Sequence, residues 1–349
     1  MNYFKTALLA ISFIFLNRDA LHAQHDSTYY VSYSKLLTAR LYFSQKYTAL
    51  TVKNKNDNYT LHYRPNTTLK MGLGASYKWA TLNLAYGFGF LNPEENKGKT
   101  KYVDLQFHAY GQKFNLDVLG QFYKGFYLYP KGGLASDPYY NRPDLRVTII
   151  GASFQYVFNH KRFSFRSTIL QNEWQKKSAG TVLLGIEAYG GRIMADSTLV
   201  PAAINQGAAA LNEKKMSFFE TGPNLGYAYT LVIHENFFLT GSASVSFDYG
   251  FSTVTTEEGE SRRYSFSPNT FLRVSAGYNS AKWAFNVFYV NNGVRLASPN
   301  NGRESTLNSG NLRLTYVRRF TPGRKEKKHL KKESSEFSSL HSKNGLWRN

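Results

Sequence analysis

The sequence predicts an all-β fold: a transmembrane antiparallel up-and-down β-barrel of about 12 strands, within a range of roughly 10 to 14. Large apolar residues alternate with small or uncharged polar residues along many segments, and no segment sustains the spacing of an amphipathic helix. Short turns also alternate with long polar loops. An export signal at the start of the chain directs it toward the cell envelope.

Residues 1–23 are predicted to be a cleaved secretory signal peptide. Lys5 provides a basic start, residues 7–16 form an apolar run, and Ala23 ends a Leu-His-Ala cleavage site. The apolar run is too short to span a bilayer, although an uncleaved N-terminal anchor is the alternative. We expect residues 24–320 to form the barrel. The lysine-rich segment 321–349 is predicted to be a basic, disordered C-terminal tail.

The stretch ATLNLAYGFGF, residues 80–90, shows the alternation clearly: its large apolar residues occupy the even positions from 82 to 90. The same pattern recurs at 224–233, 239–249 and 311–320. A soluble β-sandwich covers its outer face with charged residues, whereas the row opposite the apolar one here is Gly, Ala, Ser and Asn. We therefore expect the large apolar row to face lipid and the small row to face the barrel interior.

Turns and loops predict the topology, because outer-membrane barrels have short periplasmic turns and long external loops. The long polar loops are expected at 91–100, 130–143, 191–214, 251–263 and 297–306. Counting strands gives a conflict at 162–190, where two successive segments would both run outward. Treating 162–190 as one crossing and 57–66 as loop structure gives the even count of about 12 strands. The conflict is resolved if 174–180 returns through the lumen or if one of the two segments is not a membrane strand.

Composition limits the partners. The formal net charge is +20, and the chain contains no cysteine, so no disulfide framework is possible. Export makes nucleic acid an unsuitable partner for this basic chain. We expect membrane lipids of the outer membrane, anionic glycolipid or a cell-wall polymer instead. The last strand ends on the aromatic Phe320, which resembles the signal read by the barrel-assembly machinery.

Two stretches resemble a known family: QFYKGFYL at 121–128 and FNHKRFSFRSTILQNEWQKKSAG at 158–180. They are similar to an uncharacterised family of Bacteroidota cell-envelope proteins, a domain of unknown function. The resemblance covers the chain from about residue 30 to Phe320 and is strongest at QKKSAG. It implies an outer-membrane barrel but no activity and no catalytic residues.

Candidate binding residues fall into two groups. The first is the polar cluster 172–178, where the lysines would attract anions and the glutamate would pair with one of them; its members are Glu173, Gln175, Lys176 and Lys177. The second group would line a wet channel from the inner faces of strands: Asn224, Asp248, Arg273, Asn286 and Arg313. The alternatives are a solvated loop for the first group and close lumen packing, with charges neutralised, for the second.

The function favoured by these features is a structural or passive-transport, porin-like envelope component. An interaction protein acting through its loops and basic tail is the alternative. A lipid-modifying enzyme that uses a Ser/His pair with His62 or His108 is less favoured, since GxSxG and HExxH motifs are absent and nothing in the sequence places a serine beside either histidine. No cofactor is expected, and the lack of cysteine and of clustered histidine gives no metal site.

Overall fold

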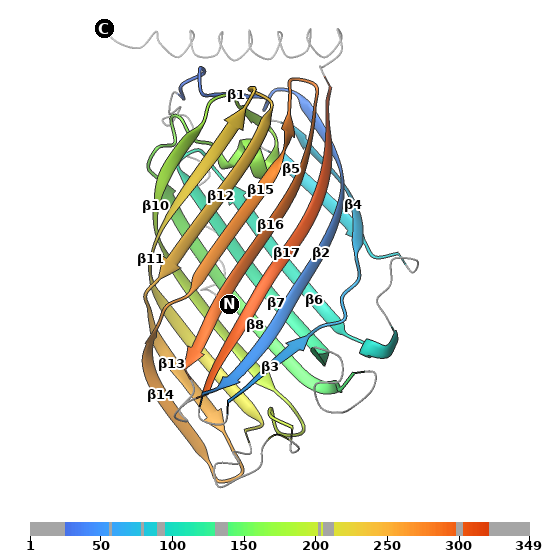
Figure 1. Ribbon diagram of the computed structural model, residues 1–349, viewed down its shortest axis with the longest axis vertical. Helices are drawn as coiled ribbons and strands as arrows, with labels where there is room; N and C mark the ends of the chain where they lie inside the picture. Colours follow the sequence, from blue (N-terminus) through green and yellow to red (C-terminus); the bar gives the residue numbers. More distant parts are fainter. Residues whose placement is uncertain are drawn as a thin grey trace, which may run out of the picture.

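A computed structural model describes residues 25–55, 58–77, 80–88, 95–129, 139–201, 204, 213–297 and 303–320. Antiparallel strands close into a barrel (Figure 1). The predicted signal peptide and C-terminal tail lie outside the described residues. Ten strands form the closed ring, which in ring order consists of β10 (Ala179–Met194), β8 (Asn141–Val157), β7 (Phe114–Tyr129), β3 (Tyr59–Arg64), β2 (Leu37–Asn54), β17 (Arg303–Phe320), β16 (Trp283–Ala297), β15 (Thr270–Asn279), β12 (Phe237–Ser246) and β11 (Lys215–Ile233).

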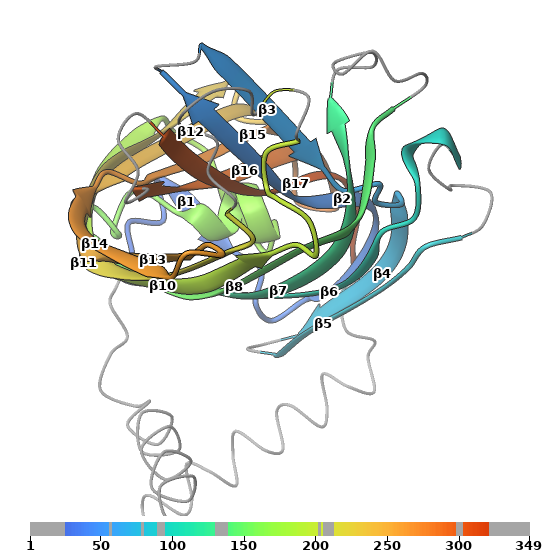
Figure 2. The same ribbon diagram turned by 90° about the horizontal axis from the view of Figure 1, so that it is seen from below.

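Five further strands extend this ring. β4 pairs with β2 and β5, β6 pairs with β7, and β13 pairs with β11 and β14. Figure 2 shows the ring from one end, with β4 and β5 on its outside beside β6. The bounds are β4 (Lys70–Tyr77), β5 (Ala80–Tyr86), β6 (Lys101–Tyr110), β13 (Asp248–Thr255) and β14 (Glu260–Ser267).

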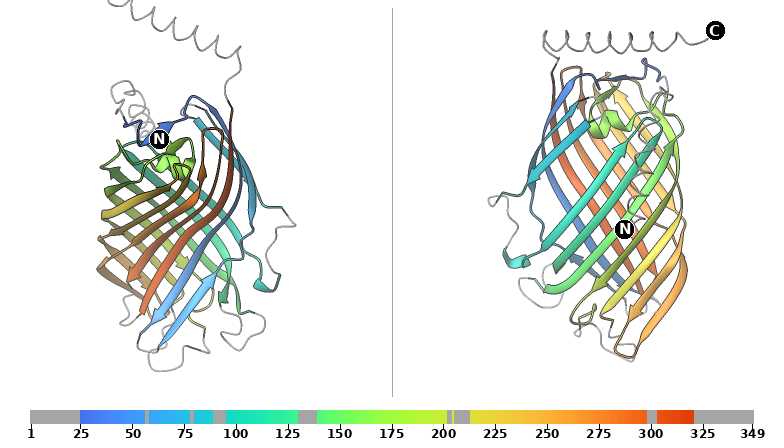
Figure 3. Two further views of the ribbon diagram at one scale, coloured as in Figure 1. Left: turned by 45° about the horizontal axis from the view of Figure 1, so that its top comes forward. Right: turned by 180° about the vertical axis from the view of Figure 1, so that it is seen from behind.

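The remaining elements are short. β1 (Tyr30–Ser32) and β9 (Glu173–Gln175) form a separate two-stranded sheet. η2 (Glu95–Lys97) is a 3-10 turn, and η3 (Arg166–Leu170) is a π-helix. Within the described ranges, no helix combines the length and apolar character needed to cross a membrane. The right-hand view in Figure 3 shows η3 inside one end of the ring.

The two ends of the barrel differ. At the short-turn end, β6 and β7, β11 and β12, and β15 and β16 are joined by only three residues each, and this end also holds η3. The long-loop end holds the connections that follow β2, β7, β10, β13 and β16. The segment 251–263, expected to be a loop, is instead mostly paired strand at this end, because β13 and β14 continue the alternation of β12 and β15.

The predicted orientation of the apolar rows is confirmed. On β11 the apolar row is exposed, from Leu225 to Ile233, while Asn224, Ala228 and Thr230 point inward and are buried. On β5, Leu82 and Leu84 are exposed as well. We call the outward apolar surface the apolar band; representative members are Leu41, Leu84, Leu105, Phe107, Val118, Phe154, Leu184, Leu225, Tyr227, Leu239, Leu272, Val287 and Leu314.

The expectation of a small-residue interior is wrong at the long-loop end. There the inner face carries large apolar side chains that form one buried cluster, including Leu50, Tyr63, Leu145, Ile149 and Met216. The strands that carry them extend past the apolar band toward the loops. An inner face beyond the band must exclude water with its own core, as in a soluble barrel, so large residues replace small ones.

One topology expectation changes, and the treatment of 162–190 as one crossing agrees with the observed strands. The segment 57–66, expected to be loop structure, contains β3, which pairs with β2 and β7. The segment 162–173 is not a membrane strand: it forms η3 and the start of β9, so only β10 crosses within 162–190. Its alternating aromatics resemble a strand in sequence, but they pack inside the ring. The ring of paired strands contains ten members.

Candidate functional site

The lumen is closed at the short-turn end by a plug, which we define as residues 163–175. Phe163 and Phe165 are buried against the wall, and the chain reverses at Gln171 in a left-handed conformation (φ 53°). Wall side chains donate to backbone carbonyls of the plug at 2.5–3.0 Å: Arg40 to Leu170, Ser275 and Asn286 to Thr168, Asn279 to Ser167 and Glu173, and Arg319 to Gln171. Each bond satisfies a carbonyl that the irregular backbone leaves unpaired.

The predicted polar cluster is divided by this arrangement. Glu173 and Gln175 lie buried in the plug. The Glu173 carboxylate pairs with Arg166 (Nη1 to Oε1, 3.2 Å) and accepts a hydrogen bond from Ser164. The expected pairing of Glu173 with a lysine is therefore not the one observed, because η3 brings Arg166 closer.

The two lysines of the cluster lie at the surface of the short-turn end, outside the lumen. The Lys176 ammonium lies 4.8 Å from the ring centroid of Trp174, and the Lys177 ammonium 5.7 Å from that of Tyr29. These two lysines were predicted to attract anions into the lumen, but their position outside it does not support that role. Cation–π contacts of this kind hold lysines on a surface.

The middle of the lumen contains a neutralised polar network. Arg273 donates to Asp117 (Nη2 to Oδ2, 2.6 Å) and to Gln155 (Nη1 to Oε1, 3.2 Å). Asp117 also bonds with His108 (Nδ1 to Oδ1, 2.6 Å) and accepts from Tyr110 (3.0 Å). This arrangement corresponds to the packing alternative for the inner-face residues, in which opposite charges compensate one another.

The other predicted inner-face residues also lie inside the ring, but there they contact uncharged side chains. Asp248 is fully buried and accepts hydrogen bonds from Ser246 (3.0 Å) and Asn269 (2.5 Å). Asn224 is buried and bonded to Gln155 (3.0 Å). The Arg313 guanidinium points inward, 4.7 Å from the Tyr42 ring centroid. These side chains fill space inside the ring.

Little free volume remains in the middle of the lumen. A cavity of about 30 Å³ lies there, lined in part by Gln106, His108, Tyr189 and Asn292. One buried water needs about 10–15 Å³ on this measure, so the cavity has room for about two. The part of the chain that the structure describes also contains no group of three His, Cys, Asp or Glu residues able to hold a metal ion.

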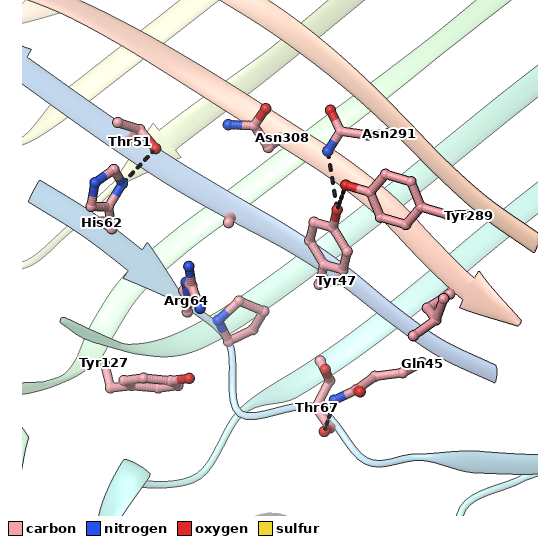
Figure 4. Close-up of a pocket in the computed structure, with 13 residues that line it drawn as sticks. Gln45, Tyr47, Thr51, His62, Arg64, Thr67, Tyr127, Tyr289, Asn291 and Asn308 are labelled. Atoms are coloured by element: carbon pink, nitrogen blue, oxygen red, sulfur yellow. Dashed lines mark hydrogen bonds between the residues drawn. The ribbon is translucent and has the colours of Figure 1, made fainter. Parts of the chain in front are cut away.

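A much larger pocket, of about 590 Å³, lies on the outside of the barrel. β2 pairs with β4 through Thr38–Ser44 and with β3 from Leu50, so residues 45–49 lack a strand neighbour on that edge among the described residues. We call this site the wall pocket (Figure 4). Its lining residues are Gln45, Tyr47, Ala49, Thr51, His62, Arg64, Pro65, Thr67, Tyr127, Tyr289, Asn291, Asn308 and Leu312.

Hydrogen bonds preorganise the wall pocket. The Tyr47 hydroxyl lies 3.0 Å from the Tyr289 hydroxyl and accepts a bond from Asn291 Nδ2 at 3.0 Å. His62 Nδ1 and Thr51 Oγ1 are 3.2 Å apart. Figure 4 shows the three tyrosine rings, the amides and Arg64 around one concavity. Fixed hydroxyl and amide groups of this kind can orient a polar ligand.

The wall pocket is basic. None of its thirteen lining residues is an acid, and the Arg64 guanidinium lies 3.9 Å from the ring centroid of Tyr129. His62 lies on β3, beyond the apolar band. Partial burial and the nearby Arg64 lower the pKa of His62 below its usual value. Arg64 therefore provides the permanent charge of the site.

The wall pocket borders the apolar band. On the three strands that form its floor, the exposed apolar residues Leu41, Val287 and Leu314 lie on the short-turn side, and the polar lining begins one to three outward positions from them. Tyrosine is enriched where protein passes from hydrocarbon to water. The geometry thus fits a site at the height of lipid head groups.

Of the residues that line this pocket, the sequence alone pointed only to His62. The other lining residues come from five separate strands and the segment after β3, so no local motif joins them. One signal was present: on β2 the outward row changes from Leu41 and Phe43 to Gln45, Tyr47 and Thr51. A polar interruption in an otherwise apolar row marks the end of the band.

Comparisons with known proteins identify one matching family and several similar structures of outer-membrane proteins. No curated protein is significantly similar to the chain. Among solved structures, it is similar to the outer membrane protease OmpT from Escherichia coli (9% identity, TM-score 0.37, covering 83% of this chain and 98% of that one). It is also similar to the toluene transporter TodX of P. putida (8% identity, TM-score 0.24, covering 82% and 91%). A third similar structure is an outer membrane channel from Pseudomonas putida F1 (9% identity, TM-score 0.27, covering 84% and 99%). The model of one family, described as "Domain of unknown function (DUF4421)", matches residues 24–320, and the chain belongs to that family.

Proposed function

We propose that this protein is an outer-membrane barrel with a closed lumen, a structural component of the envelope that binds the phosphate-bearing head group of a lipid or glycolipid in its wall pocket. The observation that carries the proposal is the position of Arg64, in an acid-free pocket of about 590 Å³ at the margin of the apolar band. Pockets of about 300–1,000 Å³ suit small ligands.

The orientation and strand number follow from the same proposal. The short-turn end faces the periplasm and the long-loop end faces outward, since this is the usual arrangement of outer-membrane barrels. At the height of the apolar band, β4, β5 and β6 take the place that β3 occupies between β2 and β7 at the long-loop end. The bilayer is therefore crossed about 12 times, an even number as such barrels require.

The filled lumen favours a structural role over passive transport. The plug, the neutralised polar network and the apolar cluster occupy successive levels of the interior, and the cavity beside the polar network measures about 30 Å³. A water-filled channel needs a continuous path, which porins provide with wider barrels. The roles proposed for external loops and for the basic tail in binding a partner remain predictions.

A lipid-modifying enzyme has less support. The hydrogen-bond partner of His108 is Asp117, and that of His62 is Thr51. Among the described residues no serine hydroxyl is hydrogen-bonded to either histidine. Activation of a serine nucleophile needs such a contact with its base.

The chemistry of the wall pocket fits an anionic head group. A guanidinium presents parallel N–H donors that match phosphate oxygens. The hydroxyls of Tyr47 and Tyr289 and the amides of Gln45 and Asn291 add uncharged donors, and the tyrosine rings suit the boundary between hydrocarbon and water. Because phospholipid and glycolipid share the phosphate, the test must compare the two sources.

The test uses the full chain refolded into phosphatidylethanolamine vesicles that contain phosphatidylglycerol, a phosphorylated glycolipid of the lipid A type, or neither. Lipid retained after mild detergent extraction is measured by mass spectrometry. We expect Arg64→Gln to lower retention of the preferred anionic lipid about tenfold, because one charge-assisted bond is lost. Retention of one anionic lipid and not the other identifies the source.

Arg192→Gln is the matched control, since Arg192 is an exposed, outward arginine on β10 near the long-loop end. Equal losses in both variants would mean unspecific charge attraction and would overturn the site. In planar bilayers we expect no steady conductance from the wild-type chain. Sustained channel steps would refute the closed lumen and restore the passive-transport function.

A further inference from the structure

The edges of β5 and β6 face each other without strand pairing. β5 pairs with β4 and β6 pairs with β7, and no described residue of β5 pairs with β6. We call these two edges the seam. Both strands carry residues of the apolar band, Leu84 on β5 and Leu105 and Phe107 on β6. Unpaired backbone at this depth is tolerated where it lines a polar or water-filled space.

Two inward residues of β6 at the seam, Gln106 and His108, are partly accessible, whereas the Asp104 side chain on the same strand is buried. The His108 side chain on β6 keeps 30% of its surface exposed. Asn115 on β7 and Gln155 on β8 also point inward, and both are at most 1% exposed. The lumen can thus be reached through the seam, whereas the wall is closed where strands are fully paired.

The accessible inner groups at the seam, Gln106 and His108, have free hydrogen-bonding capacity. The Gln106 amide has no hydrogen-bond partner among the described residues. His108 uses Nδ1 for Asp117, so Nε2 remains available. The nearby charges are occupied: Asp117 is bonded to Arg273, and Asp104 to Lys46 at 3.3 Å. An anion reaching His108 would meet the carboxylate of Asp117 behind it.

The size of the inner space limits the ligand further. Gln106 and His108 border the cavity of about 30 Å³, which has the volume of about two water molecules. A sugar or a phosphate head group does not fit, whereas a hydroxyl does. The outer faces of the two strands, with Leu82, Leu84 and Leu105, provide an apolar surface for an alkyl chain.

We propose that the seam is a side entrance from the bilayer and binds an amphiphile with a small uncharged head, such as a long-chain alcohol. The head enters to hydrogen-bond with Gln106 and His108, while the tail stays in the bilayer along β5 and β6. This site is separate from the wall pocket and does not depend on the function proposed for it.

Access to the inner face through the seam is tested by thiol labelling. The chain has no cysteine, so only the introduced thiol reacts. Gln106→Cys, in the full chain in vesicles, is treated with a maleimide attached to a lipid. Leu105→Cys, outward on β6, is the exposed control, and Ser242→Cys, inward on β12 and buried, is the closed-wall control. We expect Gln106→Cys to react within about tenfold of Leu105→Cys and at least about 100-fold faster than Ser242→Cys, which reacts only by local opening.

If Gln106→Cys reacts as slowly as Ser242→Cys, the proposed side entrance is refuted, because the seam would then be closed by strand pairing. Heat-modifiable migration on a gel confirms that each variant is folded, and His108→Cys, at the partly exposed inward position on β6, replaces Gln106→Cys if that variant does not fold.

Binding is tested with a diazirine-bearing long-chain alcohol and peptide mapping of the labelled protein. We expect labelling concentrated on β5 and β6, competed by hexadecanol and not by hexadecyl phosphate. Gln106→Leu should reduce it about fivefold through loss of one hydrogen bond, whereas Ser242→Ala leaves it unchanged. Uniform labelling of all outward faces would overturn the site, and equal competition by the phosphate would overturn the uncharged head group.

Discussion

The wall of this barrel is built in two ways. From β7 through β8, β10, β11, β12, β15, β16 and β17 to β2, each strand is hydrogen-bonded to neighbours along most of its length; we call this the continuous wall. Between β2 and β7, the described residues of strands β3, β4, β5 and β6 do not form one continuously paired sheet, and we call this region the split quarter. Contacts between side chains there connect segments whose described backbones are not hydrogen-bonded to each other. These contacts include Lys46 with Asp104 (3.3 Å), and the hydroxyls of Thr68 and Tyr102 (3.2 Å).

The local sequence explains why the wall divides there. Pro65 follows β3 and lacks the N–H needed to continue pairing. On β7 the register shifts at Gly125, which has φ 91°, and a side chain there would collide with the Lys99 carbonyl oxygen. Only glycine fits this bulge, which redirects the outer end of β7 toward β3.

The division of the wall separates two roles. In the continuous wall many inward polar side chains are buried and bonded to one another or to the plug, as Arg273 and Asn279 are, so this part provides rigidity. The wall pocket lies where the split quarter meets the continuous wall, and the seam lies within the split quarter, between β5 and β6. Irregular pairing creates concave surfaces and accessible groups, whereas complete pairing removes them.

The largest effect is expected from breaking the buried ion pair of the continuous wall. Arg273→Leu leaves the Asp117 carboxylate without its cation in a closed interior, which costs about 3–5 kcal/mol of unfolding free energy. Lys46→Leu is the matched change in the split quarter. The Lys46–Asp104 contact is longer (3.3 Å, against 2.6 Å for Arg273–Asp117) and the Lys46 side chain is partly exposed, so we expect a loss of about 1–2 kcal/mol.

Both variants are measured by urea unfolding in lipid vesicles. Adding Asp117→Asn to Arg273→Leu should restore most of the lost stability, because the second change removes the uncompensated charge. Equal losses for Arg273→Leu and Lys46→Leu would show that the two regions tolerate charge removal alike, and the contrast between them would be abandoned.

A smaller difference in stability between the two regions is expected when an inward-facing glycine of each is replaced by valine. A Cβ at Gly185 on β10 would meet the backbone carbonyl oxygen of Phe154, whereas one at Gly74 on β4 would meet the side-chain oxygen of Asn83. Backbone in a fully paired sheet cannot yield, but an asparagine side chain can rotate. Gly185→Val should therefore cost about 1–3 kcal/mol in the same urea assay, and Gly74→Val less than about 1 kcal/mol. The reverse order would contradict the comparison.

The sequence predicted the continuous wall well, since strand alternation is a local property. The outward row of β11, from Leu225 to Ile233, lies as expected. The plug could not be predicted in this way. Phe163 and Phe165 alternate like strand residues, and they turn inward only because distant side chains such as Asn279 and Arg319 satisfy the plug backbone.

The candidate sites were harder to predict than the fold. Asp248, Arg273 and Arg313 lie inward as expected, but which charges neutralise Arg273 depends on strand register and barrel closure. The wall pocket joins residues as distant as Gln45 and Leu312, whose proximity comes from pairing of the first long strand with the last. A single sequence without contact information cannot reveal such a juxtaposition.

The smallest effect concerns pH at the wall pocket. Burial and Arg64 lower the pKa of His62, so His62 is neutral at pH 7.5 in the free protein. A bound anionic head group favours the imidazolium, and binding should therefore tighten as pH falls from 7.5 to 5, by about three- to tenfold. Retention of phosphatidylglycerol is the appropriate measurement, because its phosphodiester keeps one charge throughout this range. His62→Gln should remove the pH dependence while Arg64 still binds. An unchanged pH dependence in that variant would mean that another group titrates, and His62 would then have no part in the site.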